Sequence, residues 1–367
     1  EFRRVLFRSL EKQSKNNLAL LIKFRSFKMK KQLLIAAVAA TMGTAAMADV
    51  SITGNGKFEY FHTETTATTT NNGSSDTTNT EVNLGVVGKS GDTSVVMNLE
   101  FNTHGSVDSA TAETSAGVLD VEDIYMTTKI GDISVKAGNY ASGTTALGGE
   151  MDEGGRANNK VSLSTAVGPV TIAYAASSAA GAGATAIDSD AATVTISGNV
   201  AGFKVQVKEQ SDTYTMFGIS GDVAGFGVRY ESKDGDATDT SESFGNITKS
   251  VEGIDLGFAW YEGDANGLND ETDSSIFAVE MDTTTAAPFG DSNQQVSAST
   301  TVDGNKVTFK AGKIGDKTAG TNDLDYTQIS ASRSLASGAT LALTYTDKDT
   351  ANTTDQQTFE ADISVKF

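Results

Sequence analysis

The chain has no cysteine, only two histidines and two prolines among its 367 residues, and charged residues make up 20% of it. The missing cysteines say nothing about the redox compartment, because an envelope protein can do without disulfides. A nucleophile with an imidazole base would need His62 or His104, and no Ser-His-Asp spacing accompanies either. We therefore expect a protein that is not an enzyme.

Cofactor motifs are also lacking. The glycine-containing stretches at residues 54–56 and 181–183 have no strand-to-helix context, so they are poor phosphate loops. The acid-rich stretches, for example residues 269–271, do not follow the twelve-residue pattern of a calcium loop. The sequence thus predicts no cofactor and no tightly bound metal, and solvated loops are the simpler interpretation of its acids.

Basic residues are scarce. The formal charge is −19, and residues 1–48 carry ten of the 28 bases against two of the 47 acids. Without that stretch 18 bases and 45 acids remain, a charge of −27. Because phosphate binding depends on clustered Lys and Arg, we expect no nucleic-acid partner. Such an acidic chain suits the handling of cations.

No apolar run is long enough for a membrane-spanning helix, which needs roughly 20 residues. The longest candidate lies in residues 29–48, where two lysines precede an apolar stretch and the small-residue end Ala46-Met47-Ala48. This order indicates a signal peptide cleaved before Asp49 rather than a short anchor. Residues 1–28 resemble translated adapter or upstream read-through, and we leave them out of the fold.

What the mature chain has in abundance is alternation of period two. Val50, Ile52, Phe58 and Tyr60 share one face of the first such stretch, and polar residues such as Lys57 occupy the other. Similar alternation recurs along residues 49–367 without a lasting helical period, which predicts β-strands. Exposed strand edges cannot lie in hydrocarbon, so strands that cross a membrane must close into a barrel.

The links between these stretches alternate in length. Eight short Gly- or Asp-rich turns separate strand pairs, whereas longer polar connections such as residues 63–80 and 263–274 join the hairpins. Short turns on one side and long loops on the other are typical of transmembrane barrels. We predict one all-β domain, a transmembrane antiparallel β-barrel of 16 strands. Eighteen is the alternative count, because eight turns imply nine hairpins, whereas residues 275–302 are hard to assign and one hairpin could be lost there.

A secreted β-sandwich, solenoid or adhesin is the competing interpretation, since such proteins are also rich in Thr, Asn and Gly. No fixed-period repeat supports a solenoid, and a sandwich does not require the asymmetric links. In function, this alternative is a surface-attached structural or adhesive protein.

The last strand is the most specific signal. Ile363, Val365 and Phe367 lie on one face with Phe359 and Ala361, and the chain stops on the phenylalanine. This pattern resembles the C-terminal assembly signal of Gram-negative outer-membrane proteins, which their assembly machinery reads. The resemblance implies a multi-pass protein of the bacterial outer membrane.

Four further segments resemble the general bacterial porins. They are the start of the mature chain, the strand before the third long loop, the strand and turn after that loop, and a segment near the end: residues 49–57, 131–138, 156–170 and 332–345. The chain departs from the family where porins often have Gly-Arg-Gln, since it has Gly138-Asn139-Tyr140. Basic residues are also replaced by Asn83, Glu122 and Asp123.

The porin resemblance implies a pore narrowed by an inward-folded third loop at residues 140–155. This loop supplies Glu150, Asp152 and Glu153, and strand parity places four residues on the lumen face: Lys57, Asp123, Lys136 and Arg156. We expect passive diffusion of small hydrophilic solutes and ions with a preference for cations. The resemblance also implies a homotrimer in contact with outer-membrane lipid and lipopolysaccharide. Solvated loop charges without a role in selectivity remain the alternative for the loop acids.

Overall fold

The computed structural model describes residues 49–67, 73–102, 118–142, 154–178, 187–211, 213–235, 240–263, 276–279, 292–315, 323–350 and 354–367. These residues form eighteen strands: β1 (Asp49–Ala67), β2 (Gly73–Ser90), β3 (Thr93–Asn102), β4 (Val118–Ile130), β5 (Ile133–Ser142), β6 (Gly154–Val167), β7 (Val170–Ser178), β8 (Ile187–Val200), β9 (Phe203–Gln210), β10 (Tyr214–Val223), β11 (Phe226–Gly235), β12 (Thr240–Val251), β13 (Ile254–Gly263), β14 (Ser292–Val302), β15 (Asn305–Gly315), β16 (Leu324–Ser334), β17 (Ala339–Thr350) and β18 (Thr354–Lys366). No helix in these ranges is long and apolar enough to cross a membrane.

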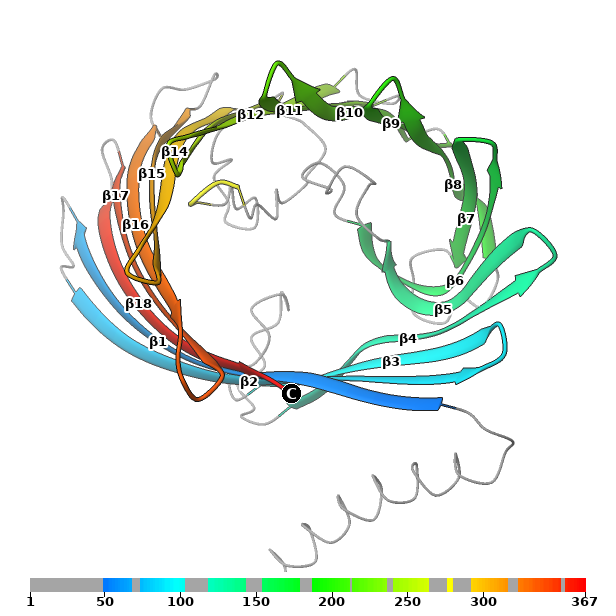
Figure 1. Cartoon of the computed structure of the whole chain (residues 1–367), viewed down its shortest axis with the longest axis horizontal. Helices are drawn as coiled ribbons and strands as arrows, with labels where there is room; N and C mark the ends of the chain where they lie inside the picture. Colours follow the sequence, from blue (N-terminus) through cyan, green and yellow to red (C-terminus); the bar gives the residue numbers. More distant parts are fainter. Residues whose placement is uncertain are drawn as a thin grey trace, which may run out of the picture.

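Every strand pairs antiparallel with its neighbours in sequence, and β1 also pairs with β18, so the sheet closes on itself (Figure 1). The seam between β1 and β18 runs from Asn55 opposite Lys366 to Ala67 opposite Thr354. Beyond it, Gly54 and Phe367 exchange two backbone hydrogen bonds of 2.9 Å. Closure leaves no strand edge unpaired, which is the condition for a sheet in hydrocarbon.

Four of the tight turns are built from a two-residue sequence ending in glycine. At Ala201-Gly202 and at the corresponding residues of three other turns, both central residues have positive φ, between 50° and 88°. This is the geometry of a type I′ turn, whose twist matches that of the strands it joins. The short turns lie together at one end of the barrel. In transmembrane barrels this end faces the periplasm.

The outer face is apolar around the ring. Large hydrophobic side chains with roughly 40 to 60% of their surface exposed point outward on almost every strand, for example Ile52 on β1 (57%), Leu256 on β13 (45%) and Ile363 on β18 (49%). A soluble protein rarely exposes a continuous apolar surface. An apolar outer band on a closed antiparallel barrel is the signature of a bacterial outer-membrane β-barrel.

These findings confirm the predicted all-β barrel and give its strand count as eighteen, the larger of the two numbers considered. They exclude the sandwich and solenoid alternatives. The proposed signal peptide and the stretch before it, residues 1–48, lie outside the described residues. So does the centre of the third long loop, residues 143–153, and its inward fold stays a prediction.

Candidate functional site: the lumen of the barrel

Residues 276–279, named the lumen segment below, identify the inner face of the barrel, because they lie inside the ring (yellow in Figure 1). Phe277 and Val279 are buried in a cluster with wall residues that include Phe244, Tyr261 and Tyr326. The side chains that share a face with these wall residues therefore line the lumen, and the alternate set faces lipid.

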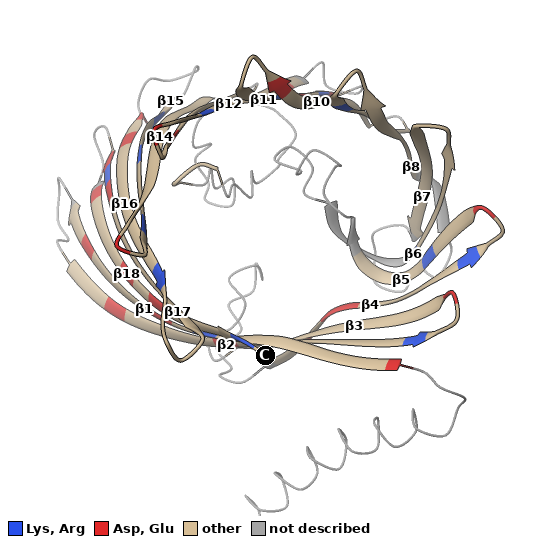
Figure 2. Ribbon diagram, viewed as in Figure 1, with Lys and Arg blue, Asp and Glu red and all other residues tan. Residues whose placement is uncertain are grey.

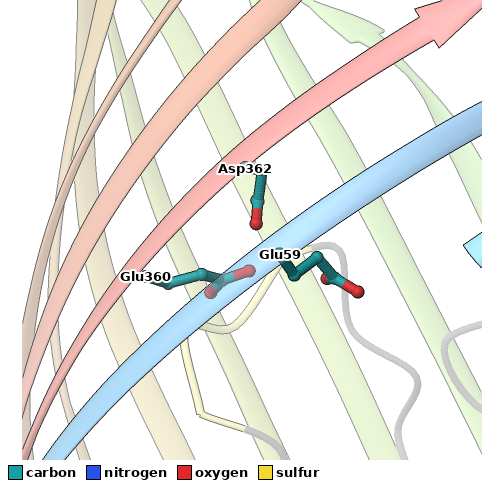
Figure 3. Close-up of side chains that lie close together, drawn as sticks. All are labelled: Glu59, Glu360 and Asp362. Carbon is teal, nitrogen blue, oxygen red and sulfur yellow. The ribbon is translucent and has the colours of Figure 1, made fainter. Parts of the chain in front are cut away.

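One side of the lumen carries a cluster of carboxylates at the β1–β18 seam. The side chains of Glu59, Glu360 and Asp362 lie close together (Figure 3), with one carboxylate oxygen of each within 4.8 Å of the others. Lys57 makes an ion pair with Glu59, and Asn79 donates a hydrogen bond of 3.1 Å to the Glu59 carboxylate. Glu59 is only 7% exposed, so its charge is held close to the wall by these two partners.

The acidic side continues over the next three strands. Glu81 on β2 lies opposite Lys57 and accepts a hydrogen bond from Asn83. On β4, Asp123 accepts a hydrogen bond of 2.8 Å from Asn98 of β3. Amide side chains thus orient the carboxylates of this arc without neutralising them.

The basic side begins at β5. The Lys136 ammonium lies 3.9 Å from the ring centroids of both Tyr125 and Tyr140. Lys160 on β6 lies 5.1 Å from the Tyr140 centroid. Such cation–π contacts are worth roughly 0.5 to 2 kcal/mol. They fix Lys136 against the wall, so its charge does not project into the centre of the lumen.

A second basic group occupies β9 to β11. Lys208 and Lys233 lie 5.5 and 4.9 Å from the Tyr214 ring centroid. Arg229 donates two hydrogen bonds, of 2.8 and 2.6 Å, to one oxygen of Glu231. Glu231 is 1% exposed, and its other oxygen accepts no hydrogen bond from the described residues. Further inner-face lysines follow at Lys204, Lys306, Lys310 and Lys348.

Charge is therefore unevenly distributed around the lumen. Acids predominate on the arc from β18 through β1 to β4, and red segments mark β18 and β1 in Figure 2. Bases predominate from β5 to β17. Exceptions on the inner face include Lys57 and Lys366 on the acidic arc, and Asp222, Glu231, Glu242 and Asp255 on the basic one. Opposed arcs of charge in a narrow space create a transverse field.

The lumen segment is held by amide side chains of the wall. Gln295 on β14 makes two hydrogen bonds of 2.7 Å, accepting from the Ala278 backbone N–H and donating to the Ile276 carbonyl. Asn293 donates to the Val279 carbonyl at 3.4 Å. Side chains of β14 thus hydrogen-bond the backbone of the lumen segment, much as a neighbouring strand would. The segment occupies space in the lumen.

At the end of the barrel with the long loops, acidic side chains face outward beyond the outer aromatic residue Tyr345. The pKa of the exposed Asp349 is raised above its usual value of 3.8 because Asp355 on β18 carries a like charge and shares a hydrogen bond with it. Asp325 and Asp347 add to this repulsion. This part of the rim, on β16 to β18, therefore carries a cluster of negative charge.

The predicted site residues are placed only in part. Lys57, Asp123 and Lys136 lie on the lumen wall, and their place at a constriction stays a prediction. Arg156 belongs to β6, where its backbone is opposite Ala141, and its side chain is outside the described part. Three loop acids, Glu150, Asp152 and Glu153, also lie outside it. Ile363, Val365 and Phe367 face outward on the strand that closes the barrel.

Some lumen residues were absent from the predicted set. Arg229 and Lys233 alternate with the apolar residues of β11, so strict parity would have found them. The lumen segment gave a weaker signal, a short apolar run within an acidic connection that has no strand period. Neither its position inside the ring nor its partners can be read from that run.

A closed eighteen-stranded antiparallel sheet, apolar outside and charged inside, defines the chain as an outer-membrane β-barrel by its architecture. No protein-family model and no curated protein matches the sequence.

Solved structures share the fold. Pseudomonas aeruginosa OccK9 (OpdG) has a TM-score of 0.61 and 11% identity, over 87% of this chain and 99% of that one. Acinetobacter baumannii OccAB4 has a TM-score of 0.60 and 9% identity, over 86% and 98%. Pseudomonas aeruginosa OccK8 (OprE) has a TM-score of 0.56 and 11% identity, over 87% and 98%. At these identities the likeness concerns the fold alone.

Proposed function

We propose that the protein is a passive diffusion channel of the bacterial outer membrane for small hydrophilic solutes and ions, with a preference for cations. The observation that carries the proposal is the lumen wall, which is polar and charged on a barrel whose outside is apolar. A soluble structural or adhesive protein has no need for an apolar outer band around a charged interior.

The cation preference is supported by the position of the acids. The carboxylates at the β1–β18 seam outnumber the one ammonium beside them, and the external rim carries further acids. Several bases across the lumen are held against tyrosine rings or carboxylates. Because close charges decide selectivity at the roughly 8 Å screening length of physiological salt, the seam acids matter more than the total charge.

The constriction is part of the same proposal. Glu150, Asp152 and Glu153 of the third long loop would face the wall bases, among them Lys136 and Arg156.

The resemblance to the general porins also supports a homotrimer, contact with lipopolysaccharide, and recognition of the chain by the outer-membrane assembly machinery. Cross-linking of detergent-purified protein tests the homotrimer. We expect cross-linked species of up to three subunits and none larger.

The channel itself is tested by two measurements on refolded protein. Planar bilayers are expected to show stepwise ionic currents, and liposomes are expected to swell in sugars at rates that fall with sugar size. Heat-modifiable migration in detergent gels verifies that the barrel is folded. A folded barrel that yields neither currents nor swelling would contradict the proposal and favour a structural or adhesive role.

A further inference from the structure

The first of two similar clusters on the inner wall centres on Gly138 of β5. In the strand register, Tyr125 of β4 and Lys160 of β6 lie on either side of this glycine. Lys136 and Tyr140 lie two residues before and after it on β5. The Lys136 ammonium is 3.9 Å from both ring centroids, which are 5.5 Å apart, and the Lys160 ammonium is 5.1 Å from the Tyr140 centroid. Two lysines thus meet one tyrosine ring, and a second ring adds to the contact.

The second cluster repeats this arrangement on β9 to β11. Lys208 and Lys233 lie in one row of the register, on either side of Met216. Tyr214 lies two residues along β10 from Met216, and the two ammonium groups lie 5.5 and 4.9 Å from its ring centroid. A cation within about 6 Å of a ring centroid is attracted by the negative face of the ring. Each of the two tyrosines therefore holds a pair of lysines.

Burial distinguishes these lysines from others on the inner wall. Lys136 is partly exposed. The remaining three have less than a tenth of their surface exposed: Lys160, Lys208 and Lys233. The rings of Tyr140 and Tyr214 are buried as well, whereas Lys204, nearer the short turn on the inner face of β9, is exposed. Lysines are almost never buried to this extent unless they are paired. The rings therefore form part of the cover over these ammonium groups.

The charges of the acidic arc are more accessible. Glu360 and Asp362 at the β1–β18 seam are partly exposed. A passing cation reaches these carboxylates directly, whereas a passing anion reaches the covered lysines only past the negative face of a ring. Because charges at short range decide selectivity in physiological salt, this difference favours cations although both arcs carry charge.

We infer that Tyr140 and Tyr214 are positioning residues that set the ion specificity of the channel. Each ring keeps two lumen lysines from pairing with permeating anions, so that the acidic arc dominates the close contacts along the path. The inference rests on the proposed channel function. It assigns the cation preference to the covering of the bases as well as to the seam acids.

The double variant Tyr140→Leu, Tyr214→Leu tests this role, because leucine fills space without an aromatic face. We expect the ratio of K⁺ to Cl⁻ permeability to fall by about twofold or more, since the uncovered lysines then pair with Cl⁻. The matched variant Tyr140→Phe, Tyr214→Phe keeps both rings and is expected to retain most of the wild-type ratio. Heat-modifiable migration verifies that each variant is folded.

A further substitution separates this role from a structural one. Adding Lys136→Gln and Lys208→Gln to the leucine variant is expected to raise the permeability ratio again, because two of the released ammonium groups are removed. A general distortion of the wall would not be reversed in this way. A ratio that is unchanged in the leucine variant, or lowered equally in the leucine and phenylalanine variants, would overturn the inference.

Chemical labelling tests the cover without any current. In the wild type, Lys160 and Lys208 are expected to react with a sulfonated acetylating ester about fivefold more slowly than Lys204, and the leucine variant is expected to lose this protection. Peptide mass spectrometry measures the rate at each lysine. A folded barrel without current contradicts the channel function and the specificity role with it. Equal labelling of the three lysines in a conducting barrel contradicts the cover alone.

Discussion

At the scale of single residues, the barrel depends on close fits that a pattern of hydrophobicity does not reveal. A Cβ added to Gly54 would lie 2.6 Å from the Phe367 ring and 2.6 Å from the backbone oxygen of Asn83, so this glycine is enclosed by the terminal ring and by β2. A Cβ on Gly56, two residues along the same face, would meet Val365 at an ordinary 3.9 Å. The sequence predicted that the terminal phenylalanine ends the last strand of a barrel. It did not show that a glycine is needed opposite the ring.

Gly54→Ala is therefore expected to destabilise the folded barrel by about 1 to 3 kcal/mol, because the new methyl group overpacks the seam. Urea titration followed by heat-modifiable migration measures the effect. Gly56→Ala is the matched control and is expected to unfold close to wild type. Equal stability of the two variants would contradict the close fit of Gly54 against Phe367 and Asn83.

The seam carboxylates give the second prediction at this scale. The double variant Glu360→Gln, Asp362→Asn removes two lumen charges, and we expect the ratio of K⁺ to Cl⁻ permeability to fall by about twofold or more in dilute salt. The control, Asp349→Asn with Asp355→Asn, removes two charges from the outer side of the rim and should change the ratio much less. The reverse order of effects would place selectivity at the rim.

At the scale of elements, the strands and their short turns follow from local rules, whereas the long connections do not. The turn at Asp303-Gly304 follows from the sequence, because Asp-Gly is one of the few dipeptides that readily adopt two successive positive φ values. The lumen segment depends instead on Gln295 and Asn293, which come after it in the chain and gain their partners only when the barrel closes. Contacts of this kind arise from tertiary structure, and no local period encodes them.

Gln295→Leu is expected to release the lumen segment, because it leaves the Ala278 N–H and the Ile276 carbonyl without their partner. Each such loss costs about 1 to 3 kcal/mol. Single-channel recordings should then show a larger and noisier current. Gln294→Leu is the matched control, since Gln294 lies on the outer face of the same strand. A current unchanged by Gln295→Leu would mean that the segment does not narrow the path.

At the scale of the whole molecule, closure of eighteen strands turns a two-residue alternation into two surfaces, one toward lipid and one toward water. Parity placed Lys57, Asp123 and Lys136 on the inner wall in advance, because the period of a strand is rigid. The separation of acids and bases into opposite arcs could not be predicted in the same way. It requires knowing which strands end up across the lumen from each other.

The central claim is an open channel that prefers cations, and the reversal potential across a planar bilayer in a KCl gradient tests it most directly. With a single refolded protein species and a tenfold gradient, we expect stepwise currents whose reversal potential has the sign of K⁺ permeation. That selectivity should weaken as salt is raised, because screening shortens the reach of the lumen acids. A reversal potential with the sign of Cl⁻ permeation would contradict the account.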